Sequence, residues 1–296
     1  MFPTLYHFLF GTFDLEIDFL RYFNSFGLFV AFAFLIAKFI FSIEIKRKTD
    51  LGFIAYKTNT PSPQEHVSVI MLIAIVFGFL GAKIFAWLEN PIPLSEFLAD
   101  PFNGLTIYGG LIFAFFISFF YLKWYKMPVL QFMDAVAPAL MLAYGVGRLG
   151  CHVSGDGDWG IVNKSIAPNW VPEWLWSYSY PNNVLGEGVL IPDCIYNDYC
   201  YQLLNPVYPT PLYETIVSTL FFILLWKLRP KVKKAGQLFF IYLFLNGIER
   251  FFIEKIRVNE FYSIVGWEIT QAEIISVTFM LIGVFGFLRL RKKSSN

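Results

Sequence analysis

Seven long apolar stretches recur along the chain, and they limit its fold more than any other feature. Each is roughly 20 residues long, the length that an α-helix needs to cross the hydrocarbon core of a bilayer. Charged residues make up 15% of the 296 residues, against roughly 25% in soluble domains. An all-α polytopic membrane protein with a single membrane domain, 1–296, is therefore predicted. The seven predicted transmembrane spans are residues 20–43, 66–88, 104–125, 128–150, 210–228, 236–257 and 268–290.

Lysine and arginine residues gather in alternate loops between these stretches, which gives the chain an orientation. Fifteen basic residues fall on one side of the predicted membrane and four on the other. Loops rich in lysine and arginine stay in the cytoplasm. The N-terminus is therefore predicted to lie outside and the C-terminus in the cytoplasm. The polar segment 151–208 then forms an extracytoplasmic head between the fourth and fifth spans.

Composition also excludes several classes of partner. A net charge of +1 argues against nucleic acid, which selects basic surfaces. The three cysteines and three histidines follow no metal-ligand spacing, so no metal and no cofactor is expected.

Cys194 and Cys200 lie on the oxidising side of the membrane and could form a disulfide. Residues 1–18 are either an amphipathic arm or a disordered tail, and no removable signal peptide is expected.

The most informative stretch runs from Gly145 to Gly160, at the outer end of the fourth span. Small residues there let helices approach closely, and Arg148 stands among them. An arginine inside a bilayer costs roughly 2.5–3.5 kcal/mol on insertion scales, so it normally has a partner or a ligand. One interpretation is a snorkelling arginine that anchors the end of the helix. The polar residues that follow favour a functional site instead: His152, Ser154, Asp156 and Asp158.

Other uncommon polar residues of the spans fall on the same predicted side of the membrane. Tyr108 opens the third span and Glu214 opens the fifth. Arg250 and Glu254 lie near the end of the sixth, so all of these groups are predicted to converge at outer-leaflet depth. Structural interpretations stay open, because Glu214 suits a helix N-terminus and Arg250 can pair with Glu254. Four residues are predicted to share one face of the sixth span: Asn246, Arg250, Glu254 and Arg257.

Two arginines from different helices at headgroup depth suit a phosphate group. Arginine keeps its charge there and binds phosphate oxygens through two parallel hydrogen bonds. Arg148 and Arg250 therefore predict a phospholipid headgroup as the ligand, with its acyl chains among the membrane lipids between the helices.

Five motifs, in order along most of the chain, resemble those of the prolipoprotein diacylglyceryl transferase family. The first three in that family are His-Gly-Gly-Leu, Asp-x-x-Ala-Pro, and Gly-Arg-x-Gly-Asn followed by an acidic residue and Trp-Gly. The last two are Pro-Thr-x-Leu-Tyr-Glu and Gly-x-x-Arg-Phe-x-x-Glu-x-x-Arg. The corresponding segments here are Tyr108 to Leu111, Asp134 to Pro138, Gly147 to Gly160, Pro209 to Glu214 and Gly247 to Arg257.

Departures from these motifs fall on polar positions. Tyr108 stands where the family has histidine, and Cys151 stands where it has asparagine. Asn246 replaces a tyrosine of the late helix. One extra residue leaves Asp156 and Asp158 as alternatives for the acidic position of the third motif. Both arginines of the predicted phosphate site are retained.

The resemblance implies an enzyme that transfers diacylglycerol from phosphatidylglycerol to the lipobox cysteine thiol of a prolipoprotein and releases glycerol phosphate. It implies a bacterial cytoplasmic (inner) membrane location, with the active site facing the outer leaflet. The alternative is a non-catalytic phospholipid-binding or lipid-moving protein of the same fold. Catalytic roles are predicted for Arg148, Arg250, His152, Asp156, Asp158 and Tyr108. Substrate binding is predicted for Arg148, Arg250, Gly109, Gly110, Ser154, Gly160, Glu214, Asn246, Glu254 and Arg257.

The implied reaction requires a base, because a free cysteine is mostly protonated at neutral pH. His152 is the first candidate, since histidine titrates in the useful range. Asp156 or Asp158 is the next, and either could instead fix the tautomer of His152. Tyr108 could only orient or relay a proton.

Overall fold

The computed structural model describes residues 1–56, 61–91, 93, 97, 106–196, 198–258, 262–264 and 267–292. The described part is mostly helical, with two small antiparallel sheets of two strands each. The chain divides into two compact units: unit 1 comprises Met1–Ala37 and Ala137–Asn296, and unit 2 comprises Lys38–Val136. The single membrane domain expected from the sequence stays a prediction.

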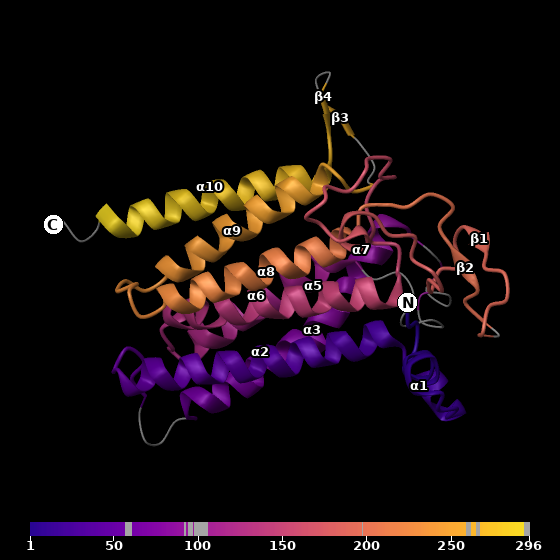
Figure 1. Cartoon of the computed structure of the whole chain (residues 1–296). Helices are drawn as coiled ribbons and strands as arrows, with labels where there is room; N and C mark the ends of the chain where they lie inside the picture. The colour runs from indigo at the N-terminus through magenta and orange to yellow at the C-terminus, as the bar shows by residue number, and fades with distance from the viewer. Residues whose placement is uncertain are drawn as a thin grey trace. The chain divides into compact units, whose positions relative to one another are not determined.

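Figure 1 shows the helices and strands by label. Among the described residues of unit 2 there are four long helices, two of them shared with unit 1: α2 (Ser25–Asp50), α3 (Pro63–Glu89), α5 (Ile107–Trp124) and α6 (Val129–Ser154). The other helices of unit 1 are α1 (Leu5–Phe13), the 3₁₀-helix η1 (Asp18–Tyr22), α7 (Glu173–Trp176), α8 (Thr210–Leu228), α9 (Gln237–Glu254) and α10 (Gln271–Lys292). Its strands pair as β1 (Val189–Leu190) with β2 (Tyr201–Gln202) and β3 (Tyr262–Ile264) with β4 (Trp267–Ile269).

Six helices of the described part are long and apolar enough to cross a membrane, namely α2, α3, α5, α6, α8 and α10. A mostly helical, polytopic membrane protein is thereby confirmed. The remaining predicted span corresponds to α9, which carries Glu249, Arg250 and Glu254 within its 18 residues. Three charged groups are more than a helix surrounded by lipid usually bears. The seventh span and the orientation therefore stay predictions.

Two helices differ from the predicted spans where side-chain contacts extend them. The first span begins at Ser25 rather than near residue 20, and it continues to Asp50 through basic residues expected in a loop. The helix continues because Lys48, which is buried, donates to Gln131 at 2.7 Å, both in unit 2. The fourth span also continues, from 150 to Ser154, so the head segment comprises residues 155–209.

Other predicted boundaries are wrong where a helix gives way to extended chain. The sixth span ends at Glu254 rather than 257. The seventh begins at Gln271 rather than 268, because the preceding residues form β4. The predicted start of the third span at residue 104 lies outside the described residues.

In unit 2, α3 and α5 cross closely because glycines meet at the contact. A Cβ atom at Gly81 would lie 2.4 Å from the carbonyl oxygen of Gly109, and one at Gly109 would lie 2.3 Å from that of Gly81. Gly110 meets Gly78 in the same way, at 2.9 Å. Small residues allow such close backbone contact between membrane helices. Gly109 and Gly110, predicted to bind substrate, therefore have a packing role within unit 2.

In unit 1, α6, α8 and α9 surround an apolar cluster of Met141, Leu225 and Leu238. Nearer the end of α6, a Cβ atom at Gly145 would lie 2.4 Å from Ser218 Oγ, so this glycine lets α8 pack closely. The end of α6, the start of α8 and the end of α9 lie at one end of the unit, beside the head segment (Figure 1). This arrangement brings polar residues from three helices together.

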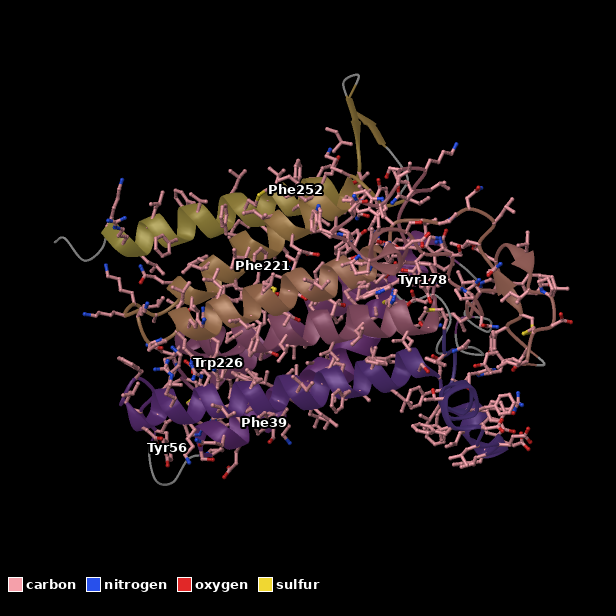
Figure 2. The ribbon with its side chains drawn as sticks, in the orientation of Figure 1. Phe39, Tyr56, Tyr178, Phe221, Trp226 and Phe252 are labelled. Atoms are coloured by element: carbon pink, nitrogen blue, oxygen red, sulfur yellow. A yellow bond between two sulfur atoms is a disulfide. The ribbon has the colours of Figure 1, made fainter. Side chains whose placement is uncertain are left out.

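Large apolar side chains lie exposed on the long helices. Phe39 on α2 is 66% exposed and Phe252 on α9 is 68% exposed (Figure 2). Exposed apolar surface of this extent is rare on soluble proteins but suits contact with lipid. The exposed phenylalanine of α9 is consistent with a membrane position for that helix too.

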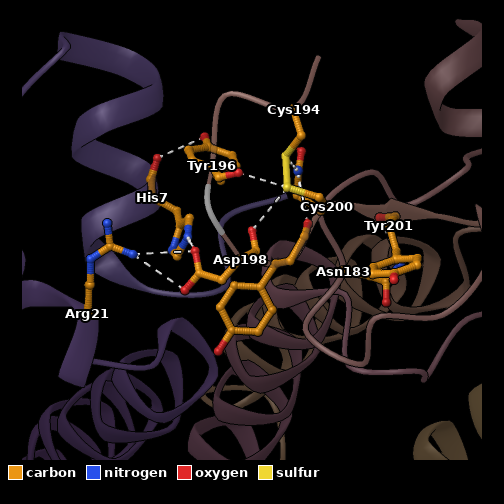
Figure 3. Close-up of a disulfide and its surroundings, with 10 residues drawn as sticks. His7, Arg21, Asn183, Cys194, Tyr196, Asp198, Cys200 and Tyr201 are labelled. Carbon is orange, nitrogen blue, oxygen red and sulfur yellow. Dashed lines mark hydrogen bonds and ion pairs between the residues drawn. A yellow bond between two sulfur atoms is a disulfide. The ribbon is translucent and has the colours of Figure 1, made fainter. Parts of the chain in front are cut away.

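The N-terminal segment is a folded arm rather than a disordered tail. His7 on α1 is fully buried, and its Nε2 lies 2.9 Å from Asp198 Oδ1 in the head segment. Arg21 lies 3.4 Å from the same carboxylate oxygen. Asp198 belongs to a short loop closed by a disulfide between Cys194 and Cys200, as Figure 3 shows. The pairing left open by the sequence is therefore present, and it closes the loop that anchors the arm.

Candidate active site

The last turn of α6 lies between Arg148 and the head segment. This helix continues to Ser154, whose hydroxyl donates to the carbonyl of Gly150 at 2.9 Å. Gly155 directly follows the helix, and its φ of 65° is one that favours glycine. His152 and Ser154 therefore belong to the end of this helix. Ser154, predicted to bind substrate, uses its hydroxyl within the helix.

Asp158 bridges two arginines. Its Oδ2 accepts a hydrogen bond from Arg148 Nη1, and its Oδ1 accepts one from Arg257 Nη2 at 2.6 Å. The side chains of Arg148 and Arg257 are only 12% and 10% exposed, so both guanidiniums are largely buried, whereas the Asp158 side chain is 31% exposed. Hydrogen bonds between charged groups are strong in such surroundings.

Glu214 forms a second bridge between the same arginines. It is fully buried at the start of α8, with Oε2 lying 2.9 Å from Arg148 Nε and Oε1 lying 3.5 Å from Arg257 Nη1. Two cations and two anions thus alternate, and their formal charges cancel. These four residues are the arginine cluster: Arg148, Asp158, Glu214 and Arg257. A membrane arginine with two acidic partners is more than a snorkelling anchor.

A threonine and a glycine position Asp158 in the arginine cluster. Thr210 Oγ1 donates to the backbone carbonyl of Asp158 at 2.8 Å. Two residues further on, Gly160 forms an antiparallel bridge with Arg257. A Cβ atom at Gly160 would lie 2.5 Å from the carbonyl oxygen of Ile256, so the backbones approach this closely only with glycine. Gly160, predicted to bind substrate, therefore acts here through its backbone.

Arg257 lies beyond the end of α9, so the predicted four-residue helix face is wrong at its last member. The chain leaves the helix after Glu254, and the bridge to Gly160 takes the place of a further helical turn. On the helix itself, Arg250 Nη2 lies 3.0 Å from Glu254 Oε2, which confirms the predicted pair. Asn246 is half-buried one turn earlier. The second arginine of the cluster is thus Arg257, whereas Arg250 pairs along its own helix.

His152 and Asp156 make contacts separate from the ion pairs of the cluster. His152 Nδ1 lies 3.2 Å from the hydroxyl oxygen of Tyr180, and the His152 ring contacts that of Tyr178. Within the described residues, the ring makes no hydrogen bond to Asp156 or Asp158, so the predicted tautomer-fixing aspartate is wrong. Asp156 Oδ1 accepts the backbone N–H of Asp158 at 3.3 Å.

The two aspartates differ in their electrostatic surroundings. Burial raises the pKa of Asp156 above its ordinary value, and the charge of Asp158 acts in the same direction. Burial also acts to raise the pKa of Asp158, but the guanidiniums of Arg148 and Arg257 outweigh it and hold that pKa below its ordinary value. Asp158 therefore stays ionised as a partner of the arginines, whereas Asp156 takes up a proton at a higher pH.

Three side chains have the donor atoms for a metal ion. The sulfur of Cys151 and one carboxylate oxygen each of Asp156 and Asp158 lie within 4.8 Å of one another. Asp158 already accepts hydrogen bonds from two guanidiniums, whose positive charge opposes a cation at the same oxygens. A metal ion at these three side chains would therefore compete with Arg148 and Arg257 for Asp158.

Tyr108, Gly109 and Gly110 lie in the first turn of α5, in unit 2. Tyr108 is half-buried, and the two glycines pack on α3. Their predicted part in a site with Arg148 stays a prediction.

Two residues at positions that no motif specifies join the site. Tyr144, one turn before Arg148 on α6, donates its hydroxyl hydrogen to Glu214 Oε2. Glu249 Oε1 lies 3.5 Å from the same hydroxyl oxygen. Tyr144 and Arg148 are four residues apart and therefore lie on the same side of α6. This spacing is the sequence signal that places Tyr144 beside the arginine cluster.

Comparisons with known proteins agree with the motif resemblance. The family model of prolipoprotein diacylglyceryl transferase matches residues 16–289. The chain belongs to that family. Similar relatives include a phosphatidylglycerol–prolipoprotein diacylglyceryl transferase of Leptospira interrogans, 25% identical over 90% of this chain and 88% of the relative. Enzymes of the same name from Clostridium botulinum and Staphylococcus saprophyticus are each 28% identical, over 86% and 88% of this chain and 92% and 82% of theirs.

Three motif segments of the prolipoprotein diacylglyceryl transferase family meet in the arginine cluster. The third motif contributes Arg148 and Asp158, the fourth contributes Glu214, and the fifth contributes Arg257. Between the two alternatives for the acidic position, Asp158 is the one that forms ion pairs with arginines, while Asp156 accepts a backbone N–H. Motifs that lie far apart in the sequence thus meet at one place in unit 1.

Asp158→Asn is expected to destabilise the protein more than Asp156→Asn. The first change removes a carboxylate that accepts hydrogen bonds from two buried guanidiniums, and a hydrogen bond to a charged group contributes about 1.5–3 kcal/mol. The second change leaves both guanidiniums with their partners. Unfolding temperatures of the two variants in detergent measure the difference, and equal values at pH 7 would contradict the role given to Asp158.

The pH dependence of stability has the same origin. A carboxyl with a lowered pKa in the folded state stabilises above its unfolded pKa, about 3.9, and loses that contribution as the pH falls through the folded value. Below about pH 4, the unfolding temperature of the parent should therefore fall more steeply than that of Asp158→Asn.

Proposed function

We propose that this protein transfers diacylglycerol from phosphatidylglycerol to the lipobox cysteine thiol of prolipoproteins, in lipoprotein biogenesis. Membership of the family and the names of the similar relatives support these substrates. The observation in this chain that carries the proposal is the buried arginine cluster at the ends of α6, α8 and α9. Guanidiniums fixed in a largely apolar protein are suited to hold the phosphate of a lipid.

Two guanidiniums have donor atoms to offer to an anion. Arg250 Nη1 and Arg257 Nε are buried and have no hydrogen-bond partner within the described part of the chain. Buried polar atoms without a hydrogen-bond partner are costly, and carboxylate oxygens of Glu214 and Glu249 are in the same situation; the two guanidinium donors are the atoms that an anionic ligand would satisfy. A phosphodiester provides both negative charge and acceptor oxygens. We assign the headgroup phosphate to Arg148 and Arg250, with Arg257 beside them.

The proposed reaction breaks one S–H bond and one C–O bond and forms one C–S bond. A base takes the thiol proton, and the sulfur attacks the glyceryl carbon that carries the phosphate ester. The C–O bond then breaks, and its electron pair leaves on glycerol phosphate. The arginines stabilise the charge that develops on this leaving group. His152 remains the first candidate base, and Asp156 is the better carboxylate candidate because burial raises its pKa.

We further propose that α9 is the seventh span, with the N-terminus outside the bacterial cytoplasmic membrane and the C-terminus inside. The charges of α9 have partners, since Arg250 pairs with Glu254 and Glu249 lies near Tyr144, and such partners lower the cost of a charge in a membrane. With the basic loops in the cytoplasm, the arginine cluster lies at outer-leaflet depth. There it would meet both phosphatidylglycerol and a membrane-anchored prolipoprotein.

Epitope tags provide a direct test of this orientation. A tag near Lys233, exposed between α8 and α9, should be reached by antibody only after the cells are permeabilised. A tag near Ile166, which is 94% exposed in the head segment, should be reached in intact cells. Detection of both tags under the same condition would contradict the proposed topology.

Arg148→Ala and Arg250→Ala should each abolish transfer, because a leaving phosphate would lose a positive partner. Arginine-to-lysine variants should also be poor, since lysine lacks the planar fork. The measurement is the mass gain of a lipobox peptide incubated with phosphatidylglycerol vesicles and each purified variant. Lys227→Ala is the control, because it removes a positive charge from the opposite end of α8.

Near-normal turnover of either alanine variant would rule out a phosphate role for that arginine. A folded parent that binds phosphatidylglycerol without modifying the peptide would favour the lipid-binding alternative over the enzyme.

The base is tested by comparing two positions. His152→Ala is expected to reduce transfer by roughly 100-fold or more, as loss of a general base does, whereas Tyr108→Phe should have a much smaller effect. Tyr108→His should be tolerated. Transfer rates at matched amounts of folded protein decide between them, and full activity of His152→Ala would move the base to Asp156.

A further inference from the structure

Tyr144 lies between two acidic residues from different helices. Its hydroxyl donates to Glu214 Oε2 on α8, and Glu249 Oε1 on α9 lies 3.5 Å from the same hydroxyl oxygen. Glu214 is 0% exposed and Glu249 is 3% exposed, so water does not compete for the hydroxyl. A hydroxyl has one hydrogen and donates to one carboxylate at a time. The shorter contact gives that hydrogen to Glu214.

The carboxylate oxygen that Tyr144 holds is also the one that holds Arg148. Arg148 Nε lies 2.9 Å from Glu214 Oε2, the acceptor atom of the tyrosine hydroxyl. The guanidinium carbon of Arg148 lies 5.1 Å from the centre of the Tyr144 ring, which is a cation–π contact. Tyr144 therefore restrains Arg148 in two ways, through a shared carboxylate oxygen and through the face of its ring.

We propose that Tyr144 is a positioning residue for the transfer reaction, acting on Arg148 through Glu214. The inference rests on the proposed function, in which Arg148 contacts the lipid phosphate. Arginine has a long side chain whose many rotamers must be restricted before it can meet a phosphate in one geometry. With the hydroxyl present, Glu214 is fixed and Arg148 Nη1 is directed to Asp158. Without it, the charges of the arginine cluster remain but the carboxylate is free to turn, and Arg148 turns with it.

Tyr144→Phe tests the proposal because it removes the hydroxyl and keeps the ring. Transfer from phosphatidylglycerol vesicles to a lipobox peptide is measured for the parent and for the variant. The expected result is a fall in kcat of about tenfold or more, the effect of losing one hydrogen bond to a charged group. The KM for the lipid should change by less than about threefold, because the positive charges that attract the phosphate are all retained.

Tyr121→Phe is the matched control. It removes another tyrosine hydroxyl from a long helix, one that lies 2.8 Å from His66 Nδ1 in unit 2. Its kcat should equal that of the parent. An equal loss in Tyr121→Phe and Tyr144→Phe would mean that the activity responds to any buried hydroxyl, and would overturn the specific role of Tyr144.

A double-mutant cycle with Glu214→Gln separates positioning from a general loss of stability. If Tyr144 acts through Glu214, then Tyr144→Phe should lower the kcat of the Glu214→Gln variant by less than about twofold. The same factor in both backgrounds, or a parental kcat in Tyr144→Phe, would overturn the proposal. A folded parent that transfers no lipid would instead contradict the proposed function itself.

Discussion

Two largely buried arginines, the fully buried Glu214 and the partly exposed Asp158 neutralise one another where three helices meet the head segment. Removal of one partner from such a buried pair leaves a charge whose cost is several kcal/mol, so the position of each group depends on the others. Asp158 comes from the head segment, while Arg148 and Glu214 come from helices. The cluster therefore ties the path of the head segment to the ends of α6 and α8.

Helices with plain apolar sequences are the part of the fold that could be predicted. The fifth predicted span, 210–228, matches α8, because length and hydrophobicity alone determine a membrane helix. Prediction failed where distant contacts decide the boundary. Lys48 extends α2 because its side chain donates a hydrogen bond to Gln131 of α6. Helix α9 ends before Arg257 because that residue forms a backbone bridge with Gly160. A sequence pattern contains neither partner.

The candidate site was predictable as a set of residues but not as a set of pairs. Motif spacing indicated Arg148, Asp158, Glu214 and Arg257, yet it gave no reason to join Arg257 rather than Arg250 to Arg148. The pairing with Arg257 depends on Gly160: because glycine has no side chain, the backbone of the head segment can approach the chain that follows α9. The partner of His152 was unpredictable for the same reason, since Tyr180 lies 28 residues away in irregular chain.

The central claim is that this balanced cluster receives the phosphate of phosphatidylglycerol. An experimental structure of the protein in a lipid nanodisc, with phosphatidylglycerol bound, tests it most directly. The account predicts phosphate oxygens at about 2.7–2.9 Å from the guanidinium nitrogens of Arg148 and of Arg250 or Arg257. A headgroup bound elsewhere, with Arg148 still held only by Asp158 and Glu214, would contradict it.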